Sequence, residues 1–255
     1  MRKIPLLIVL VSFVNSFFSI YASDSVVNIY SARKEALILP LLKSFKKETG
    51  IKFRLVTGKA DGLLKRLEIE GRLSPADLFI TVDAGRLQRA KQAGVLQAIN
   101  NPTLNRRIPK SLRDRDNYWF GLSQRARTII YNKNLVNAED LSTYENLASP
   151  VWKGQLCIRS SDSIYNQSLV ASMIEVNGIK KTESWARNLV SNFARPPTGG
   201  DTDLLKATAA GQCGIALANT YYLGRLINSK NNEEKIAAQN LAVFWPNQGD
   251  GDRGA

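Results

Sequence analysis

The 255-residue chain contains no histidine and only two cysteines. The absence of histidine excludes catalytic triads built on an imidazole base and zinc sites that combine thiolate with imidazole. Cys157 and Cys213 both lie in short apolar runs that predict buried strands. An oxidising compartment would allow them to form a disulfide, whereas two buried free thiols would act as small apolar side chains. The sequence leaves both alternatives open.

Recognisable catalytic and phosphate-binding motifs are also missing. The stretch GKADG at residues 58–62 lacks the glycine spacing and the Lys-Ser/Thr ending of a phosphate-binding loop. The stretch DGD at residues 250–252 is followed by no glutamate and does not complete a calcium loop. Turns are the simpler interpretation of both stretches. We therefore predict that the protein is not an enzyme.

A basic start and one long apolar run indicate export. Arg2 and Lys3 precede an apolar run over residues 4–20, and the small residue Ala22 marks an expected cleavage site. The run is close to the roughly 20 residues of a membrane span, so an uncleaved anchor is the alternative. We expect residues 1–22 to be a signal peptide and the mature protein to be periplasmic.

The composition is that of a folded protein with an excess of positive charge. Hydrophobic residues make up 44% of the chain, and Lys plus Arg number 35 against 22 Asp plus Glu, a net charge of +13. Such an excess favours anionic partners. The charges are scattered along the chain, however, and no nucleic-acid-binding module is recognisable, so we expect no nucleic-acid partner.

Strands and helices alternate along the sequence. Strand patterns at residues 26–30, 51–56 and 77–82 are separated by helical patterns at 34–49 and 61–71, and a further helix is expected at 84–93. This alternation predicts a parallel sheet covered by helices. A polar linker at 100–117 and a strand at 120–132 lead to a second unit with strands at 155–159 and 214–218. We predict two α/β lobes, residues 23–124 and 125–240, with residues 241–255 returning toward the first.

Three tyrosines follow predicted strands at the points where helices begin. Tyr221 and Tyr222 come after the strand at 214–218, with Asn219 or Thr220 as the expected helix N-cap, and Tyr165 follows the strand at 155–159, with residues 160–162 as expected caps. The carboxyl ends of strands in an α/β sheet usually present ligand-binding groups. The positive end of a helix also favours a phenolate. The alternative is that these are ordinary amphipathic side chains with hydrated hydroxyls.

A set of short segments that spans the mature chain is distinctive: IYSAR at 29–33, SPAD at 74–77, TVDAGRL at 81–87, RAR at 125–127, RSS at 159–161 with YN at 165–166, FARPP at 193–197, NTYYLGR at 219–225 and GDGDRG at 249–254. In these segments the chain resembles the periplasmic ferric-ion-binding proteins of bacterial and cyanobacterial iron uptake systems. This resemblance implies the two-lobed periplasmic binding protein type II fold, with Fe(III) held in a cleft by Tyr165, Tyr221 and Tyr222. It also implies delivery of the iron to an ATP-driven inner-membrane permease. We expect the receptor to be a monomer. Relatives continue well beyond GDGDRG, so we expect the C-terminal part of the fold to be missing.

Phenolates suit ferric iron chemically. Fe(III) is a hard ion that favours anionic oxygen donors, and three phenolates balance its three charges without a carboxylate. A free tyrosine has a pKa of about 10, so the metal must displace the protons and acidification should favour release.

Three phenolates leave coordination positions to be filled. Some relatives have His-Tyr after the first motif, where this chain has Lys34 and Glu35. Arg33 and Arg125 resemble the positions by which other relatives hold carbonate against the iron, and guanidinium geometry suits that anion. Arg127 shares a strand face with Arg125 and could replace it.

Four further residues are expected around the ligands, and the site keeps a rival interpretation. These residues are Tyr30, Asn219, Arg225 and Glu35, and Glu35 or water could complete the site in place of carbonate. The arginines could instead form only salt bridges. A receptor of the same fold for an oxyanion or another small solute is the alternative function.

Overall fold

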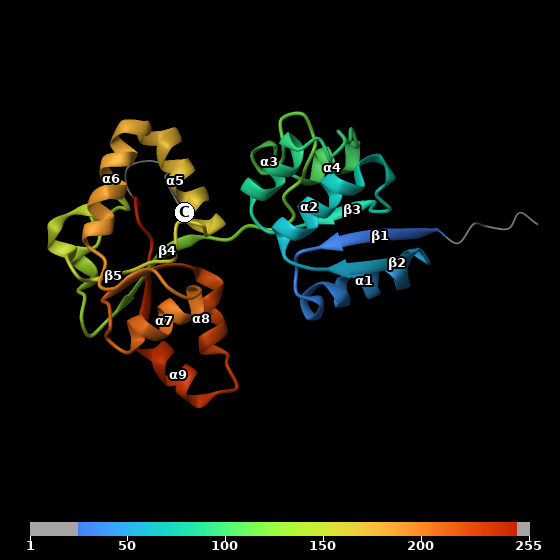
Figure 1. Cartoon of the computed structure of the whole chain (residues 1–255). Coiled ribbons are helices and arrows are strands. Elements are labelled where there is room, and N and C mark those ends of the chain that lie inside the picture. The colour runs from blue at the N-terminus through green and yellow to red at the C-terminus, as the bar shows by residue number, and fades with distance from the viewer. Residues whose placement is uncertain (1–24, 249–255) are drawn as a thin grey trace, which may run out of the picture. The chain divides into compact units, whose positions relative to one another are not determined.

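The computed structural model describes residues 25–248, whose elements are drawn in Figure 1. These residues form two units, a smaller one of residues 25–58 and 75–80 and a larger one of residues 59–74 and 81–248. The signal peptide expected at residues 1–22 and the GDGDRG motif at 249–254 lie outside the described residues. The lobe boundaries drawn from the sequence stay a prediction.

A parallel sheet forms the centre of the smaller unit. β1 (Val26–Ser31) lies between β2 (Lys52–Thr57) and β3 (Leu78–Ile80) and pairs in parallel with both. α1 (Glu35–Thr49) connects β1 to β2, and its buried side chains pack with those of β1 in one apolar core. The expected parallel pairing is therefore confirmed.

Glycines end two of the helices as the sequence predicts. Gly50 follows α1 with a φ of 74°, and its amide donates to the carbonyl of Lys46. Gly94 follows α3 (Ala84–Gln92) after one further residue and has a φ of 68°. Only glycine adopts this left-handed conformation without steric cost, which is why the helices end there.

The larger unit begins with helices and short 3₁₀ turns. α2 (Ala60–Glu70) and α3 lie where the sequence predicts them. The 3₁₀ turns of the described chain are η1 (Gly71–Leu73), η2 (Lys110–Leu112), η3 (Ala138–Asp140), η4 (Glu145–Ala148) and η5 (Pro150–Trp152).

Two expectations for residues 100–132 were wrong. The predicted linker contains α4 (Pro102–Arg107), because the Asn101 side chain accepts hydrogen bonds from the amides of Thr103 and Leu104 and so caps a helix. The strand expected from residue 120 begins only at Arg127. Its pairing partner ends at Asn219, opposite Arg127, so the ladder cannot extend further.

A mixed sheet forms the centre of the larger unit. Its strand order is β5 (Leu156–Cys157), β6 (Ile215–Asn219), β4 (Arg127–Asn132) and β7 (Leu241–Phe244). β5 and β6 are parallel, as the alternation predicts, whereas β4 runs antiparallel to both β6 and β7. The remaining helices of this unit are α5 (Ile164–Asn177), α6 (Ile179–Ser191), α7 (Asp201–Ala209), α8 (Thr220–Ile227) and α9 (Asn232–Gln239).

Helices cover both faces of the mixed sheet. Ala216 and Ala218 of β6 belong to the apolar core shared with α7, α8 and α9. Ile215 and Leu217 belong to the opposite core, which includes side chains of α5 and α6. This period-two alternation fixes the register of β6 and thereby the point at which α8 begins.

A disulfide joins Cys157 of β5 to Cys213, which precedes β6, with a Cα–Cα distance of 5.9 Å. This answers the question that the sequence left open. The bond closes a loop between residues 56 positions apart. In the chain-entropy account, a loop of this length stabilises the fold by roughly 4 kcal/mol.

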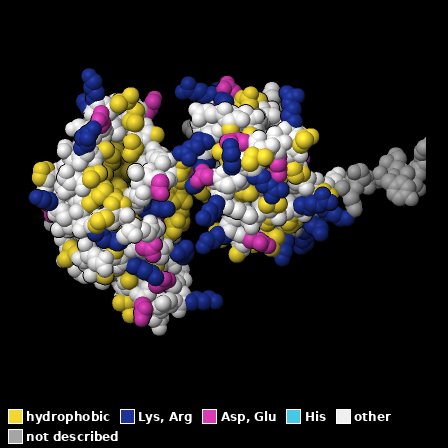
Figure 2. All heavy atoms as spheres, viewed as in Figure 1, with side chains coloured by type: hydrophobic (Ala, Val, Ile, Leu, Met, Phe, Trp, Pro, Cys, Tyr) yellow, Lys and Arg dark blue, Asp and Glu magenta, His cyan; other side chains and the backbone are white. Residues whose placement is uncertain are grey.

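Charges of both signs are scattered over the face of the described residues that Figure 2 shows. On the faces visible in Figure 2, Lys and Arg side chains are scattered, with Asp and Glu side chains among them. This agrees with the scattered charges of the sequence. Within residues 25–248, none of the helices has the length and apolar character that a bilayer span requires.

Candidate metal centre

Tyr165 is the second residue of α5, and the loop that presents it is held by Asn166. The Asn166 side-chain amide donates to the carbonyls of Arg159, at 2.8 Å, and Ser160, at 3.1 Å. The residue at the N-cap position is Ser163, and its hydroxyl makes no capping bond. The expectation that residues 160–162 would cap this helix was therefore wrong, because the N-cap position is Ser163 and the Ser160 hydroxyl accepts from the Asp162 amide within the loop instead.

Tyr221 and Tyr222 are the second and third residues of α8. Of the two residues expected as the N-cap of α8, Asn219 and Thr220, Asn219 occupies this position. Its side chain, however, makes no capping bond. Its amide nitrogen instead lies 3.5 Å from the Tyr221 hydroxyl oxygen and donates to it. The two tyrosine rings lie against each other, with centroids 4.3 Å apart.

The structure brings two of the hydroxyls together across the sheet edge. The Tyr221 hydroxyl donates to the Tyr165 hydroxyl over 3.4 Å, because α5 and α8 begin where the neighbouring parallel strands β5 and β6 end. Hard cations bind oxygen ligands at roughly 2.0–2.6 Å, so one ion can contact two oxygens at this separation. Tyr221 remains 44% exposed and therefore open to an incoming ligand.

Burial raises the pKa of Tyr165, Tyr221 and Tyr222 above the ordinary value for tyrosine. The largest cause is partial removal from water, which disfavours the charged phenolate. The expected contribution of the helix N-terminus stays a prediction. Without a metal ion the phenols therefore stay protonated at neutral pH. A bound cation has to displace these protons.

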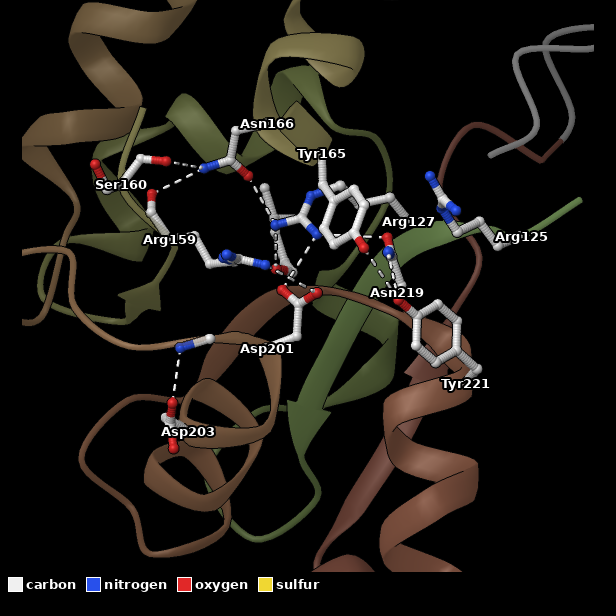
Figure 3. A network of polar contacts seen from close by, with 12 residues as sticks. Arg125, Arg127, Arg159, Ser160, Tyr165, Asn166, Asp201, Asp203, Asn219 and Tyr221 are labelled. Atoms are coloured by element: carbon white, nitrogen blue, oxygen red, sulfur yellow. Dashed lines mark hydrogen bonds and ion pairs between the residues drawn. The ribbon is translucent and has the colours of Figure 1, made fainter. Parts of the chain in front are cut away.

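Three guanidinium groups surround the Tyr165 ring (Figure 3). Their Cζ atoms lie 4.8 Å from the ring centroid for Arg125, 5.4 Å for Arg159 and 5.9 Å for Arg127. Two carboxylates offset this charge: Asp83 pairs with Arg125 at 3.0 Å, and Asp201 pairs with Arg127 at 3.3 Å. Cations close to the ring stabilise a phenolate relative to the neutral phenol.

The remaining predicted residues fall into two groups. Arg225 of α8 donates to the Thr202 hydroxyl at 3.0 Å and lies over the Tyr222 ring at 5.6 Å. In the smaller unit, Tyr30 is a buried residue of β1, and Arg33 and Glu35 are exposed around the start of α1. The roles predicted for the residues of the smaller unit stay predictions.

Sequence reasoning missed three residues of the site: Arg159, Asn166 and Asp201. Asp201 opens α7, where an acidic residue is an ordinary N-terminal feature. Its partners Arg127 and Arg159 lie far away along the chain, so no local pattern could have marked it.

Carboxylates, histidine and cysteine form no metal cluster in the part of the chain that the structure describes. A cavity of about 360 Å³ lies beside Tyr165, with Arg125, Arg127 and Asp83 also in its polar lining and Leu169, Met173 and Val176 on its α5 side. The oxygens that meet at this point are the phenol oxygens of Tyr165 and Tyr221, whereas the nearby carboxylates of Asp83 and Asp201 are paired with arginines. Such a donor set suits a strongly charged oxygen-seeking ion.

Residues 74–250 match the family model described as bacterial extracellular solute-binding protein. The chain belongs to this family. Its members are solute-binding receptors that act outside the cytoplasm, and it is not an enzyme family. The resemblance to ferric-ion-binding proteins that the motifs indicated is confirmed by the following relatives.

The curated relative named iron uptake protein A1, from Synechocystis sp., is 49% identical over 222 residues. The match covers 87% of this chain and 62% of the relative, so the chain spans less than two thirds of that relative's length. A solved structure of Trichodesmium IdiA, also called FutA, in complex with iron and citrate ligands is 52% identical, with a TM-score of 0.86 over 90% of this chain and 72% of that chain. The ferric binding protein from Campylobacter jejuni is 41% identical, with a TM-score of 0.82 over 89% and 72% of the two chains. These matches confirm the expected fold class of two-lobed α/β periplasmic binding proteins.

Proposed function

We propose that this protein is a periplasmic receptor that binds Fe(III) through Tyr165, Tyr221 and Tyr222 and delivers it to an inner-membrane ABC permease. The observation that carries the proposal is the 3.4 Å approach of the Tyr165 and Tyr221 hydroxyls, with Tyr222 packed against Tyr221. Relatives whose names state iron uptake or ferric binding support it. The protein acts as a monomeric carrier and not as an enzyme.

Ferric binding releases protons in this proposal. Because the pKa values of the three phenols are raised, each phenol is protonated before iron binds. Each one releases its proton to solvent when its oxygen binds the ion. Affinity therefore rises with pH and falls on acidification, because protons compete with the metal for the same oxygens. Three phenolates cancel the charge of Fe(III).

An anion completes the coordination. Arg125 lies beside Tyr165, its side chain is 25% exposed, and Asp83 engages one of its terminal nitrogens. Arg125 thus keeps donors for a carbonate held against the iron, and Arg33 is the second candidate. Arg127 is buried and is therefore a weaker candidate than Arg125 for contact with the carbonate. Glu35 and water are the other candidates for the open positions.

Titration of the purified protein with ferric citrate, followed by absorbance, tests the function. Phenolate ligation predicts a visible charge-transfer band that saturates at one iron per chain. The guanidinium groups around Tyr165 favour one rival, a receptor for an oxyanion or small solute bound by hydrogen bonds. That rival predicts no band on adding ferric citrate, together with a rise in thermal stability on adding the anion alone.

A further inference from the structure

We propose that Arg127, held by the buried Asp201, is a positioning residue that sets the spacing of the tyrosine hydroxyls in the ferric site. The inference rests on the proposed function and assigns Arg127 a role other than direct contact with an anion. Figure 3 shows the network that carries it.

Arg127 contacts the neighbours of two of the proposed ligands at once. One terminal nitrogen donates to the Asn166 side-chain oxygen at 2.7 Å and to the backbone carbonyl of Leu217 at 2.8 Å. The other lies 3.4 Å from the Asn219 side-chain oxygen. Asn166 directly follows Tyr165, and Asn219 stands two residues before Tyr221. One rigid guanidinium thus joins the first turns of α5 and α8.

The two asparagines transmit this orientation. A side-chain amide has one acceptor end and one donor end, so an oxygen held by a cationic donor fixes where the nitrogen points. The nitrogen of Asn219 points to the Tyr221 hydroxyl, at 3.5 Å. That of Asn166 points to the carbonyls of the loop before Tyr165. Loss of Arg127 would remove the donor that holds both amide oxygens and would thereby loosen both tyrosines.

Asp201 holds the guanidinium and cancels its charge. Its side chain is 0% exposed, and its oxygens lie 3.3 Å from Arg127 and 3.9 Å from Arg159. Burying two charges removes the solvation of each, so such a pair contributes little net stability compared with apolar side chains. The role of the Arg127–Asp201 pair is therefore to position the tyrosine hydroxyls and not to stabilise the fold. Neutralisation by Asp201 also reduces the repulsion between Arg127 and an incoming Fe(III).

Arg127→Lys tests the inference without changing the charge. Lysine keeps a cation beside Asp201 but cannot reach Asn166, Asn219 and Leu217 together. The matched control is Arg187→Lys, which changes an exposed arginine paired with Glu183 at 2.6 Å within α6. Ferric affinity is measured by competition with a chelator, and the position of the charge-transfer band reports the geometry around the iron.

Residues that orient metal ligands typically contribute 10- to 100-fold to metal affinity, so we expect Arg127→Lys to weaken ferric binding at least tenfold. We also expect its charge-transfer maximum to move and its iron to pass to the chelator faster, while the control matches the wild type. Unchanged affinity and an unmoved band in the folded Arg127→Lys protein would overturn the inference, even if its thermal stability were lower.

Asn219→Ala keeps the inference testable if Arg127→Lys does not fold. This variant leaves the Arg127–Asp201 pair intact and removes the link to Tyr221, so the same tenfold loss and band shift are expected. Unchanged binding by folded Asn219→Ala would equally overturn the positioning role. If the wild-type protein develops no charge-transfer band at all, the ferric function itself has failed, which is a different result from a wild type that binds iron and variants that bind it equally well.

Discussion

Removing one hydroxyl at a time separates the metal-binding role of the tyrosines from their structural role. Tyr165→Phe keeps the ring between its three arginines and removes the oxygen that accepts from Tyr221. That hydrogen bond is long, at 3.4 Å, and exposed, so its loss should change the free energy of unfolding by no more than about 1 kcal/mol.

The expected effect on iron is much larger. Residues that merely orient metal ligands contribute 10- to 100-fold, so loss of a charged ligand should weaken ferric binding by at least about 100-fold. At about 1.4 kcal/mol for each factor of ten, this is roughly 3 kcal/mol, several times the effect on folding. Tyr221→Phe and Tyr222→Phe should behave alike.

Two measurements decide the matter. Competition with a chelator gives the ferric affinity, and thermal unfolding of the iron-free protein gives the stability. Tyr118→Phe is the matched control, because the Tyr118 ring lies under Lys91, away from the contacts that join the three tyrosines. Ferric affinity equal to that of the wild type in all three ligand variants would refute the phenolate site.

Three further predictions concern the disulfide, acid stability and the anion. Replacing Cys157 and Cys213 together by serine should lower the free energy of unfolding by roughly 4 kcal/mol in denaturant titrations, and an equal stability would show that the cross-link constrains little. Burial alone raises the pKa of Asp114, but hydrogen bonds from Lys91 and from backbone amides outweigh it and lower that pKa. This carboxylate therefore stabilises the fold above about pH 4, its unfolded value, and the contribution is lost as pH falls through the folded value, so Asp114→Asn should flatten the acid limb of a stability–pH curve. Ferric loading should depend on bicarbonate, and Arg33→Ala should lose this dependence together with much of the ferric affinity. Undiminished iron binding in degassed, bicarbonate-free buffer, with no effect of Arg33→Ala, would instead favour Glu35 or water as the completing ligand.

Local patterns in the sequence predict most elements of this fold. Apolar residues at helical spacing predict α1, and Gly50 marks its end, because the left-handed conformation after the helix suits glycine alone. Apolar runs predict β5 and β6, and the three tyrosines lie in the helices that follow these strands, as their positions in the sequence indicate. These features depend on near neighbours in the chain. They are therefore visible in sequence.

Features that depend on a distant partner in the chain could not be predicted from the sequence. The start of β4 at Arg127 is set by the end of β6 at Asn219, which no pattern near residue 120 can reveal. The pairing of Cys157 with Cys213 likewise needed the distance between their backbones, because two apolar runs are equally compatible with free thiols.

The chemistry of the site divides in the same way. The sequence by itself determined that oxygen donors and not imidazole would hold any metal, since the chain has no histidine, and it placed Tyr165, Tyr221 and Tyr222 at helix starts. Tertiary structure alone decided that two of their hydroxyls meet and that burial raises their pKa values. It also decided that Arg127 and Asp201, 74 positions apart, lie buried together beneath them. The physical reason is that burial and charge pairing arise from packing between distant segments, whereas apolar periodicity and a helix-ending glycine such as Gly50 depend on residues that are close together in the chain.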